Sequence, residues 1–439
     1  MTTILAFIFV LSILVIVHEF GHYAVAKLAG IGVERFSIGM PPRFIGIKIG
    51  ETDYCISAIP FGGYVKLTGQ SDISQNEEED YGGKDYRKKP VLVRMAVLAA
   101  GSIMNLVTAV VIFFLVYWVT GVADSTNTVG FVKNDTLASQ VGLRIGDEIT
   151  EVNGKEITQL DEVFLALIAD NSTVLTVRND DGERMIDIPR KLEDQENFGI
   201  ALYYEAKIKS VISDSPAEKA GISPGDIIIA IDNEPVFGWE HMRSIVEANP
   251  DTEKIFTISR GGKEIILPVN IDHISQDDPD GKEKIIGRVG YHLDVPVRDT
   301  GMVESLEMAY VNTKFLAVHT LGFFVKLLTG SMSVKHLGGP VMIAQLAGES
   351  AESGFSSLLG FTAFISVNLG VLNLLPFPVL DGGHIVILFI ETIFRRKLPE
   401  KIQMAFQNAG ALFLLLLMLY ISFNDIMRTE IIGRLFGGN

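Results

Sequence analysis

The chain has 439 residues, of which 48% are hydrophobic and 21% charged, and its formal net charge is −16. A chain this apolar is not intrinsically disordered, and its acidic balance argues against nucleic acid as a partner. The single cysteine, Cys55, excludes an internal disulfide and a cysteine-based zinc finger. Residues 121–300 hold 34 acidic and 18 basic residues, whereas the rest is balanced. The sequence therefore predicts an acidic block inserted in a neutral, apolar frame.

That frame contains long uncharged runs, and a membrane span needs about 20 apolar residues. The first run continues past His18 and Glu19 to Lys27, and it lacks the charged start and small-residue end of a removed signal peptide. A buried core helix is the alternative for this first run. We expect four transmembrane helices, over the runs Met1–Val17, Met95–Ala123, Ser353–Leu380 and Ile402–Asn424. The predicted fold is thus an α-helical polytopic membrane protein, with membrane segments over 1–120 and 353–439.

Lysine and arginine predict the orientation of these spans. They are concentrated near the span ends in residues 27–94, between the first two spans, and in residues 395–401, between the last two. Because basic loops stay on the cytoplasmic side, we expect both segments to be cytoplasmic. The acidic block and both termini then lie on the opposite side.

The acidic block contains an internal repeat with an offset of 79 residues. The sequence Val-Gly-Leu-Arg-Ile-Gly-Asp at 141–147 corresponds to Ala-Gly-Ile-Ser-Pro-Gly-Asp at 220–226. Each copy predicts a short helix, a Gly-Asp turn and a strand, and each resembles the bacterial PDZ pattern. We expect two inserted α+β PDZ domains, over 121–204 and 205–295. PDZ domains bind extended peptides by strand addition, and a role as plain structural spacers stays open.

Residues 302–332 are apolar at helical spacing, yet Lys314 and Lys326 leave too short an uncharged stretch to span a bilayer. An amphipathic helix lying at the interface fits better, followed by a connector, and together they make up the predicted segment 296–352. A further crossing here would also place Asp381 on the side of the membrane opposite to the cytoplasm.

The sequence His18-Glu19-Phe20-Gly21-His22 is an HExxH motif inside the first predicted span. On a helix, two histidines four residues apart share a face and can bind one zinc ion, with the glutamate beside the activated water. Charged residues inside a membrane are costly and usually functional. The alternative is a structural cluster in which these polar groups satisfy one another.

A catalytic zinc ion needs a third protein ligand and an open fourth position. Asp381 follows the third span in the run from Asn368 to His384, and His384 is its only nearby rival. The histidines of the acidic block, at 241, 273 and 292, lie on the wrong side of the membrane. Both motifs are expected near the cytoplasmic side of the bilayer.

Three features together resemble the site-2 protease family: HExxH in the first span, the PDZ-like repeat, and Asn373-Leu-Leu-Pro376-Phe-Pro-Val-Leu-Asp381-Gly. The resemblance implies that His18, His22 and Asp381 bind one zinc ion, that Glu19 is the catalytic acid and base, and that His384 is structural. It also implies that Asn373 contacts the substrate strand or the developing oxyanion, with Asn368 and Pro376 in the same substrate-binding set. Asn373 bonding the backbone freed by Pro376 is an equally open reading.

Residues 44–49 and 54–59 read as two strands around the turn 50–53, a hairpin signal. In the family, a membrane-associated sheet of this kind follows a Gly-x-Gly element, whereas here Gly39-Met40 is followed by Pro41 and Pro42. One edge of the sheet could hold an unwound substrate, although the sequence does not indicate which one. A soluble cytoplasmic hairpin is the alternative.

The resemblance implies an intramembrane zinc endopeptidase in a bacterial inner membrane, with periplasmic PDZ domains and an active site toward the cytoplasm. The implied substrates are single-pass membrane proteins, namely an anti-sigma factor of the sigma-E envelope-stress response after its first cleavage and remnant signal peptides. Membrane lipid is expected as a partner and nucleic acid is not. The alternatives are a PDZ-bearing scaffold with a vestigial metal site and a divalent-metal transporter, although the spans lack the repeated halves usual in transporters.

Overall fold

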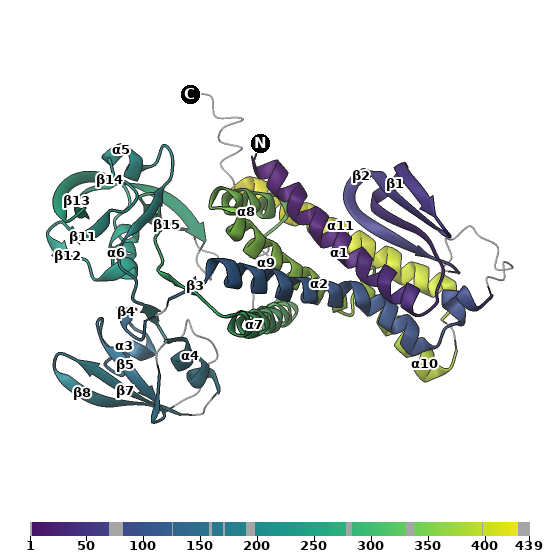
Figure 1. The fold of residues 1–439 in the computed structure, drawn as a ribbon, viewed down its shortest axis with the longest axis horizontal. Helices are drawn as coiled ribbons and strands as arrows, with labels where there is room; N and C mark the ends of the chain where they lie inside the picture. Colours follow the sequence, from purple (N-terminus) through teal and green to yellow (C-terminus); the bar gives the residue numbers. More distant parts are fainter. Residues whose placement is uncertain are drawn as a thin grey trace. The chain divides into compact units, whose positions relative to one another are not determined.

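The computed structural model describes residues 2–69, 82–124, 126–157, 160–169, 172–189, 198–277, 283–330, 338–396 and 398–428. The chain divides into two compact units (Figure 1). Residues 1–121 and 299–439 form the first, which we call the membrane unit. Residues 122–298 form the second, which we call the inserted unit.

The prediction of four apolar helices long enough to cross a membrane is confirmed for the part of the chain that the structure describes. They are α1 (Thr2–Leu28), α2 (Val91–Thr120), α9 (Phe355–Leu374) and α11 (Glu400–Arg428), the last with its apolar stretch at Lys401–Phe423. Within the most apolar 18-residue stretch of each helix, 39% of the residues are buried in α2 and only 6% in α11. Helix α2 is therefore the internal span, and α11 turns most of its surface outward.

The third apolar run is not one continuous helix. Helix α9 ends at Leu374, a short loop follows, and a separate helix α10 begins at Asp381 and ends at Phe394. Pro376 and Pro378 lie in this loop, where their fixed backbone angle and missing N–H groups interrupt helical hydrogen bonding. Asp381 thus occupies the first position of a new helix rather than the end of the third span.

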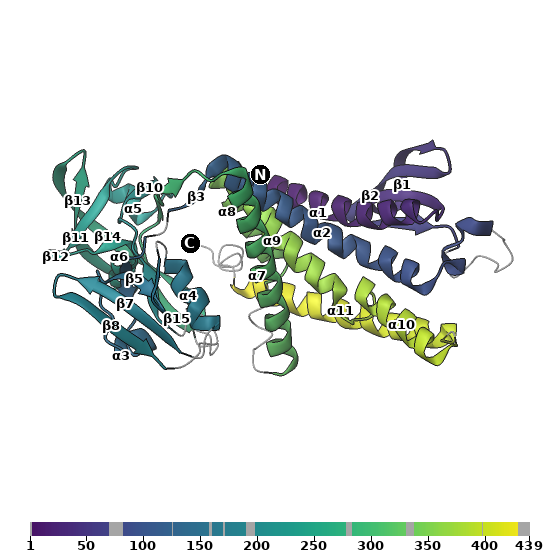
Figure 2. The same cartoon turned by 60° about the horizontal axis from the view of Figure 1, so that its bottom comes forward.

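Helix α2 packs against α1, α9, α10 and α7 (Met302–Leu328), while α8 (Pro340–Glu352) packs against α1, α9 and α11. Helix α7 runs across the direction shared by α1, α2 and α9, as Figures 1 and 2 show from two sides. Its Asn312 donates a hydrogen bond to the hydroxyl of Tyr117 on α2, at 2.9 Å. The buried side of α7 is thereby fixed to α2, and its other side exposes apolar residues such as Val303, Tyr310 and Val318.

Strands β1 (Val33–Ile49) and β2 (Thr52–Leu67) form an antiparallel sheet that covers one side of α1 (Figure 1). The predicted hairpin is present, but both strands are longer than expected and fold back on themselves. Arg35 pairs with Asp53 on one side and with Lys66 on the other. Four segments therefore lie side by side, and the outer two are residues 45–49 and 63–67.

The inserted unit contains two lobes in which the same kinds of element recur in the same order, with one additional strand, β15, in the second. The first lobe has a sheet ordered β6-β5-β7-β8 and a separate pair β4–β9, and the second has β12-β11-β13-β14-β15 and a pair β10–β16. The first-lobe strands are β4 (Val129–Val132), β5 (Glu148–Val152), β6 (Lys155–Glu156), β7 (Thr173–Asn179), β8 (Gly182–Ile188) and β9 (Ile200–Leu202), with helices α3 (Leu137–Gln140) and α4 (Leu160–Ala169).

The second-lobe strands are β10 (Ile208–Val211), β11 (Ile227–Ile231), β12 (Glu234–Pro235), β13 (Thr252–Arg260), β14 (Lys263–Asp277), β15 (Glu283–Arg288) and β16 (Tyr291–Leu293), with helices α5 (Pro216–Ala220) and α6 (Gly238–Glu247). The short strands β3 (Val122–Ala123) and β17 (Val297–Arg298) pair with each other where the chain enters and leaves this unit. Each lobe has its own apolar core, built around Phe198 in the first and Phe256 in the second.

The Gly-Asp turn of each repeat is held by an ion pair between a buried aspartate and a partly exposed arginine. Asp226 is fully buried, accepts a hydrogen bond from the Ser223 N–H, and pairs with Arg260 at 2.7 Å. In the first lobe, Asp147 pairs with Arg184 at 2.6 Å in the same way. Burial raises the pKa of Asp226, but the bonds from Arg260 and Ser223 outweigh it and hold this pKa below its usual value. The aspartate of the repeat therefore serves the fold.

We expect Arg260→Met to lower the stability of the second lobe, because the variant leaves the Asp226 carboxylate buried without its charged partner. In the unmutated chain the low pKa of Asp226 stabilises the lobe above the unfolded-state pKa of about 4, and this contribution disappears as the pH falls through the folded-state pKa. Hydrogen exchange of residues 206–277 in the full-length protein measures both effects.

The matched control is Arg243→Met, which removes an arginine from an exposed pair with Glu247 on α6 and should change exchange little. Equal protection of the wild-type and Arg260→Met lobes would show that the pair has no stabilising role.

Candidate metal centre

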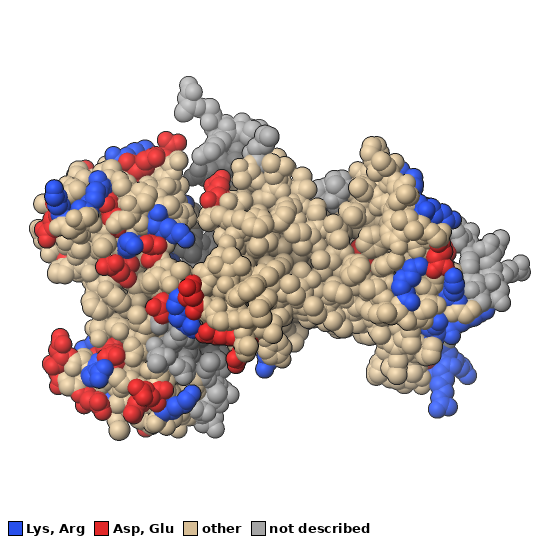
Figure 3. Space-filling model, in the orientation of Figure 1, with Lys and Arg blue, Asp and Glu red and all other residues tan. Residues whose placement is uncertain are grey.

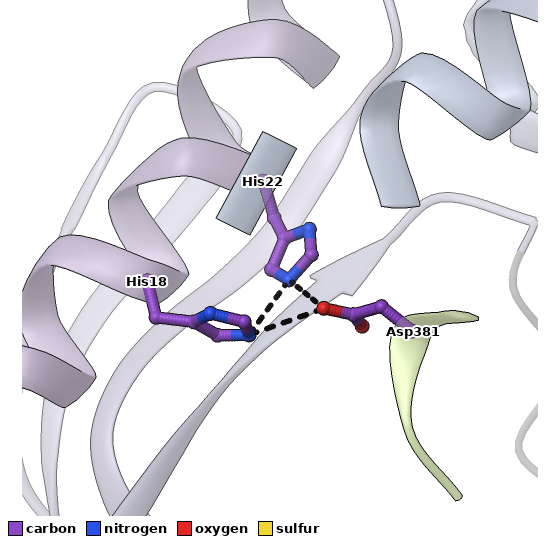
Figure 4. Close-up of side chains that lie close together, drawn as sticks. All are labelled: His18, His22 and Asp381. Carbon is purple, nitrogen blue, oxygen red and sulfur yellow. Dashed lines mark hydrogen bonds and ion pairs between the residues drawn. The ribbon is translucent and has the colours of Figure 1, made fainter. Parts of the chain in front are cut away.

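The two histidines of the HExxH motif lie on one face of α1 (Figure 4). A spacing of four residues places successive side chains one helical turn apart. The two rings meet edge to face with centroids 4.8 Å apart, and their Nε2 atoms are 3.2 Å apart. Both nitrogens therefore point toward one place, as the spacing predicts.

Asp381 reaches the same place from the start of α10 (Figure 4). The loop before it includes Val379, whose φ of 78° lies in the left-handed region. A β-branched residue adopts this conformation only at a cost of about 1–3 kcal/mol, and such strain persists where the surroundings determine the backbone. The loop also contacts α11, where Phe377 packs on Phe413 with ring centroids 5.5 Å apart.

The three side chains have the separations of a metal ligand set. The Oδ2 atom of Asp381 lies 3.3 Å from Nε2 of His18 and 3.5 Å from Nε2 of His22. Ligand atoms each about 2.0–2.1 Å from a tetrahedral zinc ion are about 3.3 Å from one another. Two imidazoles and one carboxylate also match the donor types of catalytic zinc sites. The residues present fit a zinc ion with one open coordination position.

Helix α2 forms the wall behind the histidines. A Cβ atom at Gly101 would overlap Nε2 of His22 and lie 2.7 Å from Cε1 of His18, and a Cβ at Gly21 on α1 would overlap the carbonyl oxygen of Ala100. The two helices can therefore touch only because these positions lack side chains. The Nδ1 atom of His22 lies 2.7 Å from the carbonyl oxygen of Val97, which fixes the ring.

Two further polar residues of α2 contact the ligands, and the sequence reasoning missed both. The hydroxyl of Ser102 donates to Oδ2 of Asp381 at 3.4 Å, and Nδ2 of Asn105 lies 3.3 Å from Nδ1 of His18. Both residues are fully buried. The sequence did contain a signal for them: Gly101-Ser102-Ile-Met-Asn105 places small and polar residues at helical spacing inside an apolar span. Polar groups in a membrane span need partners, so these residues could have been expected to face other polar groups.

Glu19 lies beside the cluster, against the sheet. A Cβ atom at Gly63 of β2 would come within 2.8 Å of Cγ of Glu19. The outer segment 63–67 of the sheet therefore passes next to the glutamate of the motif. It pairs with the segment 33–38 on one side, and no other strand pairs with it in the ranges that the structure covers.

The remaining residues predicted for the site lie outside the three-residue cluster. Asn368 accepts a hydrogen bond from Thr320 of α7 at 2.7 Å and donates one to the carbonyl of Phe364 at 2.9 Å. Asn373 is half-buried near the end of α9, and Pro376 is exposed in the loop that leads to Asp381. Within the described residues, the one group of three potential ligands is His18, His22 and Asp381, without His384.

We expect Gly101→Ala to weaken zinc binding by about tenfold or more, because the new methyl group would displace both imidazoles and ligand placement controls affinity. The measurement is zinc retained per chain against a competing chelator. Gly360→Ala on α9 is the control, since its Cβ meets no atom within 4 Å. Unchanged zinc affinity in Gly101→Ala would contradict the close packing of α2 on the centre.

Known proteins resemble this chain over nearly its whole length. The family model for Peptidase family M50 matches residues 6–417. A candidate zinc metalloprotease of Neisseria meningitidis is 36% identical and covers 98% of this chain and 99% of its own. The regulator of sigma-E protease RseP of Escherichia coli is 34% identical, with 96% and 98% covered, and its Salmonella typhimurium counterpart 33%, with the same coverage. The chain therefore belongs to peptidase family M50, as an intramembrane zinc metalloendopeptidase of that family.

Proposed function

We propose that His18, His22 and Asp381 hold one zinc ion and that Glu19 is the catalytic acid and base. The observation that carries this proposal is the mutual separation of the three ligand atoms, 3.2–3.5 Å. They come from α1 and from the start of α10 and converge inside an apolar helix bundle. The family membership supports peptide hydrolysis as the reaction.

The chemistry divides between the metal and the chain. When bound, zinc supplies a Lewis acid that activates water and polarises the scissile carbonyl. Glu19 takes the proton that the attacking water loses and returns it to the leaving amine. The imidazoles and the Asp381 carboxylate would hold the ion in place, and the half-buried position of all three ligands limits access of bulk water.

We expect Glu19→Gln to keep one zinc per chain and to lose cleavage of a model transmembrane substrate by about 10²–10⁴-fold, the contribution of a positioned acid or base. Zinc content and cleavage are measured on the same purified sample. The control is Glu51→Gln, a glutamate of the turn between β1 and β2 that pairs with Lys27 and Lys84, which should remain active. Normal cleavage by Glu19→Gln would remove Glu19 from the mechanism.

The proposed substrates are transmembrane segments of single-pass membrane proteins. The relatives named for sigma-E regulation support an anti-sigma factor that another protease has already trimmed, and remnant signal peptides are a second class. Asn373 and Pro376 lie on the chain leading to Asp381, which favours contact with the substrate strand. Asn368 belongs to this proposed set less directly, because a substrate would have to replace its bond with Thr320.

An intramembrane peptidase must hold its substrate extended, since a helix conceals its carbonyls in backbone hydrogen bonds. The sheet has two outer segments. Residues 63–67 lie next to Glu19, whereas residues 45–49 form the opposite edge of the sheet. Strand addition along an open edge supplies backbone bonds to an unwound peptide. We therefore assign the edge at residues 63–67 to substrate.

We expect a cysteine at position 64 to crosslink to a cysteine placed beside the scissile bond of the substrate. The background is Glu19→Gln with Cys55→Ser, because Cys55 is the chain's single cysteine. Tyr64→Cys tests the edge assigned to substrate, and Ile47→Cys on the opposite outer segment is the matched control. Crosslinking at position 47 with none at position 64 would assign substrate to the other edge.

The proposed location is a bacterial inner membrane with the metal centre toward the cytoplasm. In the membrane unit, Lys and Arg side chains gather over the end that carries the β1–β2 sheet and α10 (Figure 3), as the bias of basic residues toward the cytoplasm requires. The two lobes of the inserted unit then face the periplasm. Their recurring element order supports the proposal that both are PDZ domains, over 121–204 and 205–295, which sense or select trimmed substrates by size.

The alternative of a PDZ-bearing scaffold with a vestigial metal site is not favoured. A site without a metal does not need three potential ligands at metal-binding separations. It also does not need a backbone carbonyl that hydrogen-bonds the Nδ1 atom of His22 and orients its ring. Membership of a peptidase family over residues 6–417 points the same way.

A further inference from the structure

The two histidine ligands differ in how their outer nitrogens are satisfied. The Nδ1 atom of His22 lies 2.7 Å from the carbonyl oxygen of Val97. A carbonyl only accepts, so this Nδ1 carries a proton, and in the neutral ring the lone pair of Nε2 faces the cluster. His22 is thereby fixed in the form that binds a metal through Nε2. His18 must adopt the same form if its Nε2 atom, 3.3 Å from the Asp381 carboxylate, is to bind the same ion.

The outer nitrogen of His18 faces Asn105. The Nδ2 atom of Asn105 lies 3.3 Å from Nδ1 of His18, the residue is fully buried, and its Oδ1 atom has no hydrogen-bond partner in the described part of the chain. With the metal-binding form of His18, two N–H groups would oppose each other. Metal-bound histidines instead donate this proton to an acceptor, which sets the orientation of the ring.

A half-turn of the Asn105 amide resolves the conflict. Its oxygen and nitrogen have nearly the same size and shape, so exchanging them needs no additional space. In either orientation of the Asn105 amide, one of its two polar atoms lacks a partner, so the exchange adds no unsatisfied group. The exchange does, however, give the His18 Nδ1–H an acceptor. The backbone of Asn105 is held in place by Ser366 of α9, whose hydroxyl donates to its carbonyl at 2.8 Å.

We propose that Asn105 is a positioning residue for zinc: its Oδ1 atom accepts the Nδ1–H of His18 and fixes the ring with Nε2 toward the ion. This rests on the proposed zinc site. Asn105 does not touch the reacting atoms. It does for His18 what the Val97 carbonyl does for His22, so α2 orients both imidazoles from behind.

The test compares Asn105→Leu, which keeps the shape but removes the acceptor, with Asn105→Asp, which keeps an acceptor. We expect the leucine variant to bind zinc about 10–100-fold more weakly and the aspartate variant to retain affinity, both measured by chelator competition on the full-length protein. Asn312→Leu is the matched control, since it removes a partly buried asparagine bond between α7 and α2 that is not part of the centre.

A purely structural role gives a different result. It predicts that Asn105→Leu lowers the melting temperature of the metal-free protein, whereas the positioning role predicts that only the increase in melting temperature on adding zinc becomes smaller. Equal zinc affinity of Asn105→Leu and wild type, or equal losses in the leucine and aspartate variants, would overturn the proposal.

A measurement on the unmutated chain does not depend on the folding of any variant. In ¹⁵N-histidine spectra of the zinc-loaded protein, we expect both coordinated rings to carry a proton on Nδ1 and to bind through Nε2. Coordination of either ring through Nδ1 would refute the role of Asn105. Failure of the wild-type protein to bind zinc at all would instead refute the zinc site, so the two failures are distinguishable.

Discussion

The metal centre depends on the close approach of α1 to α2. Gly21 on one helix and Gly101 on the other leave no room for side chains between the backbones. In a bilayer, lipid tails are as apolar as leucine, so helices associate through van der Waals contact at small residues. This contact places His18 and His22 on the surface of α2 and determines where Asp381 must arrive. A bulkier residue at the crossing would separate the helix that carries the motif from the helix that orients it.

Polar groups inside the bundle form one connected set for a related reason. An unpaired polar group in apolar surroundings costs several kcal/mol, and the polar side chains of α2 at the centre contact groups on neighbouring helices. Ser102 bonds Asp381 and Ser366 bonds the Asn105 backbone, which ties α2 to α10 and to α9. The groups proposed to bind the metal and the groups that hold the helices together therefore overlap. A change in helix packing alters ligand geometry, even where no ligand is mutated.

The sequence is sufficient for the parts of this site that lie within short motifs. His18 and His22 follow from helical spacing, and Asp381 was among the few acids near a span end. The contribution of α2 was missed, because Gly101, Ser102 and Asn105 indicate only that polar groups of this span need partners, and their contacts with the ligands arise when α1 and α10 pack on them. The break after Leu374 could have been anticipated from Pro376 and Pro378, which hydropathy alone overlooks. The folding back of β1 and β2 depends on pairing between distant residues, which alternation within a strand does not specify.

Two glycines bring backbone against the residues of the HExxH motif. Gly101 presents bare helix to the imidazoles, and Gly63 presents bare strand to Glu19. A peptide that enters as an extended strand needs backbone partners at its own spacing, and it needs its carbonyl within reach of both the ion and the glutamate. An open sheet edge within a bilayer is costly unless protein covers it. Our proposal that the edge at residues 63–67 accepts the substrate strand meets both needs, because this edge is unpaired in the described sheet and lies beside Glu19.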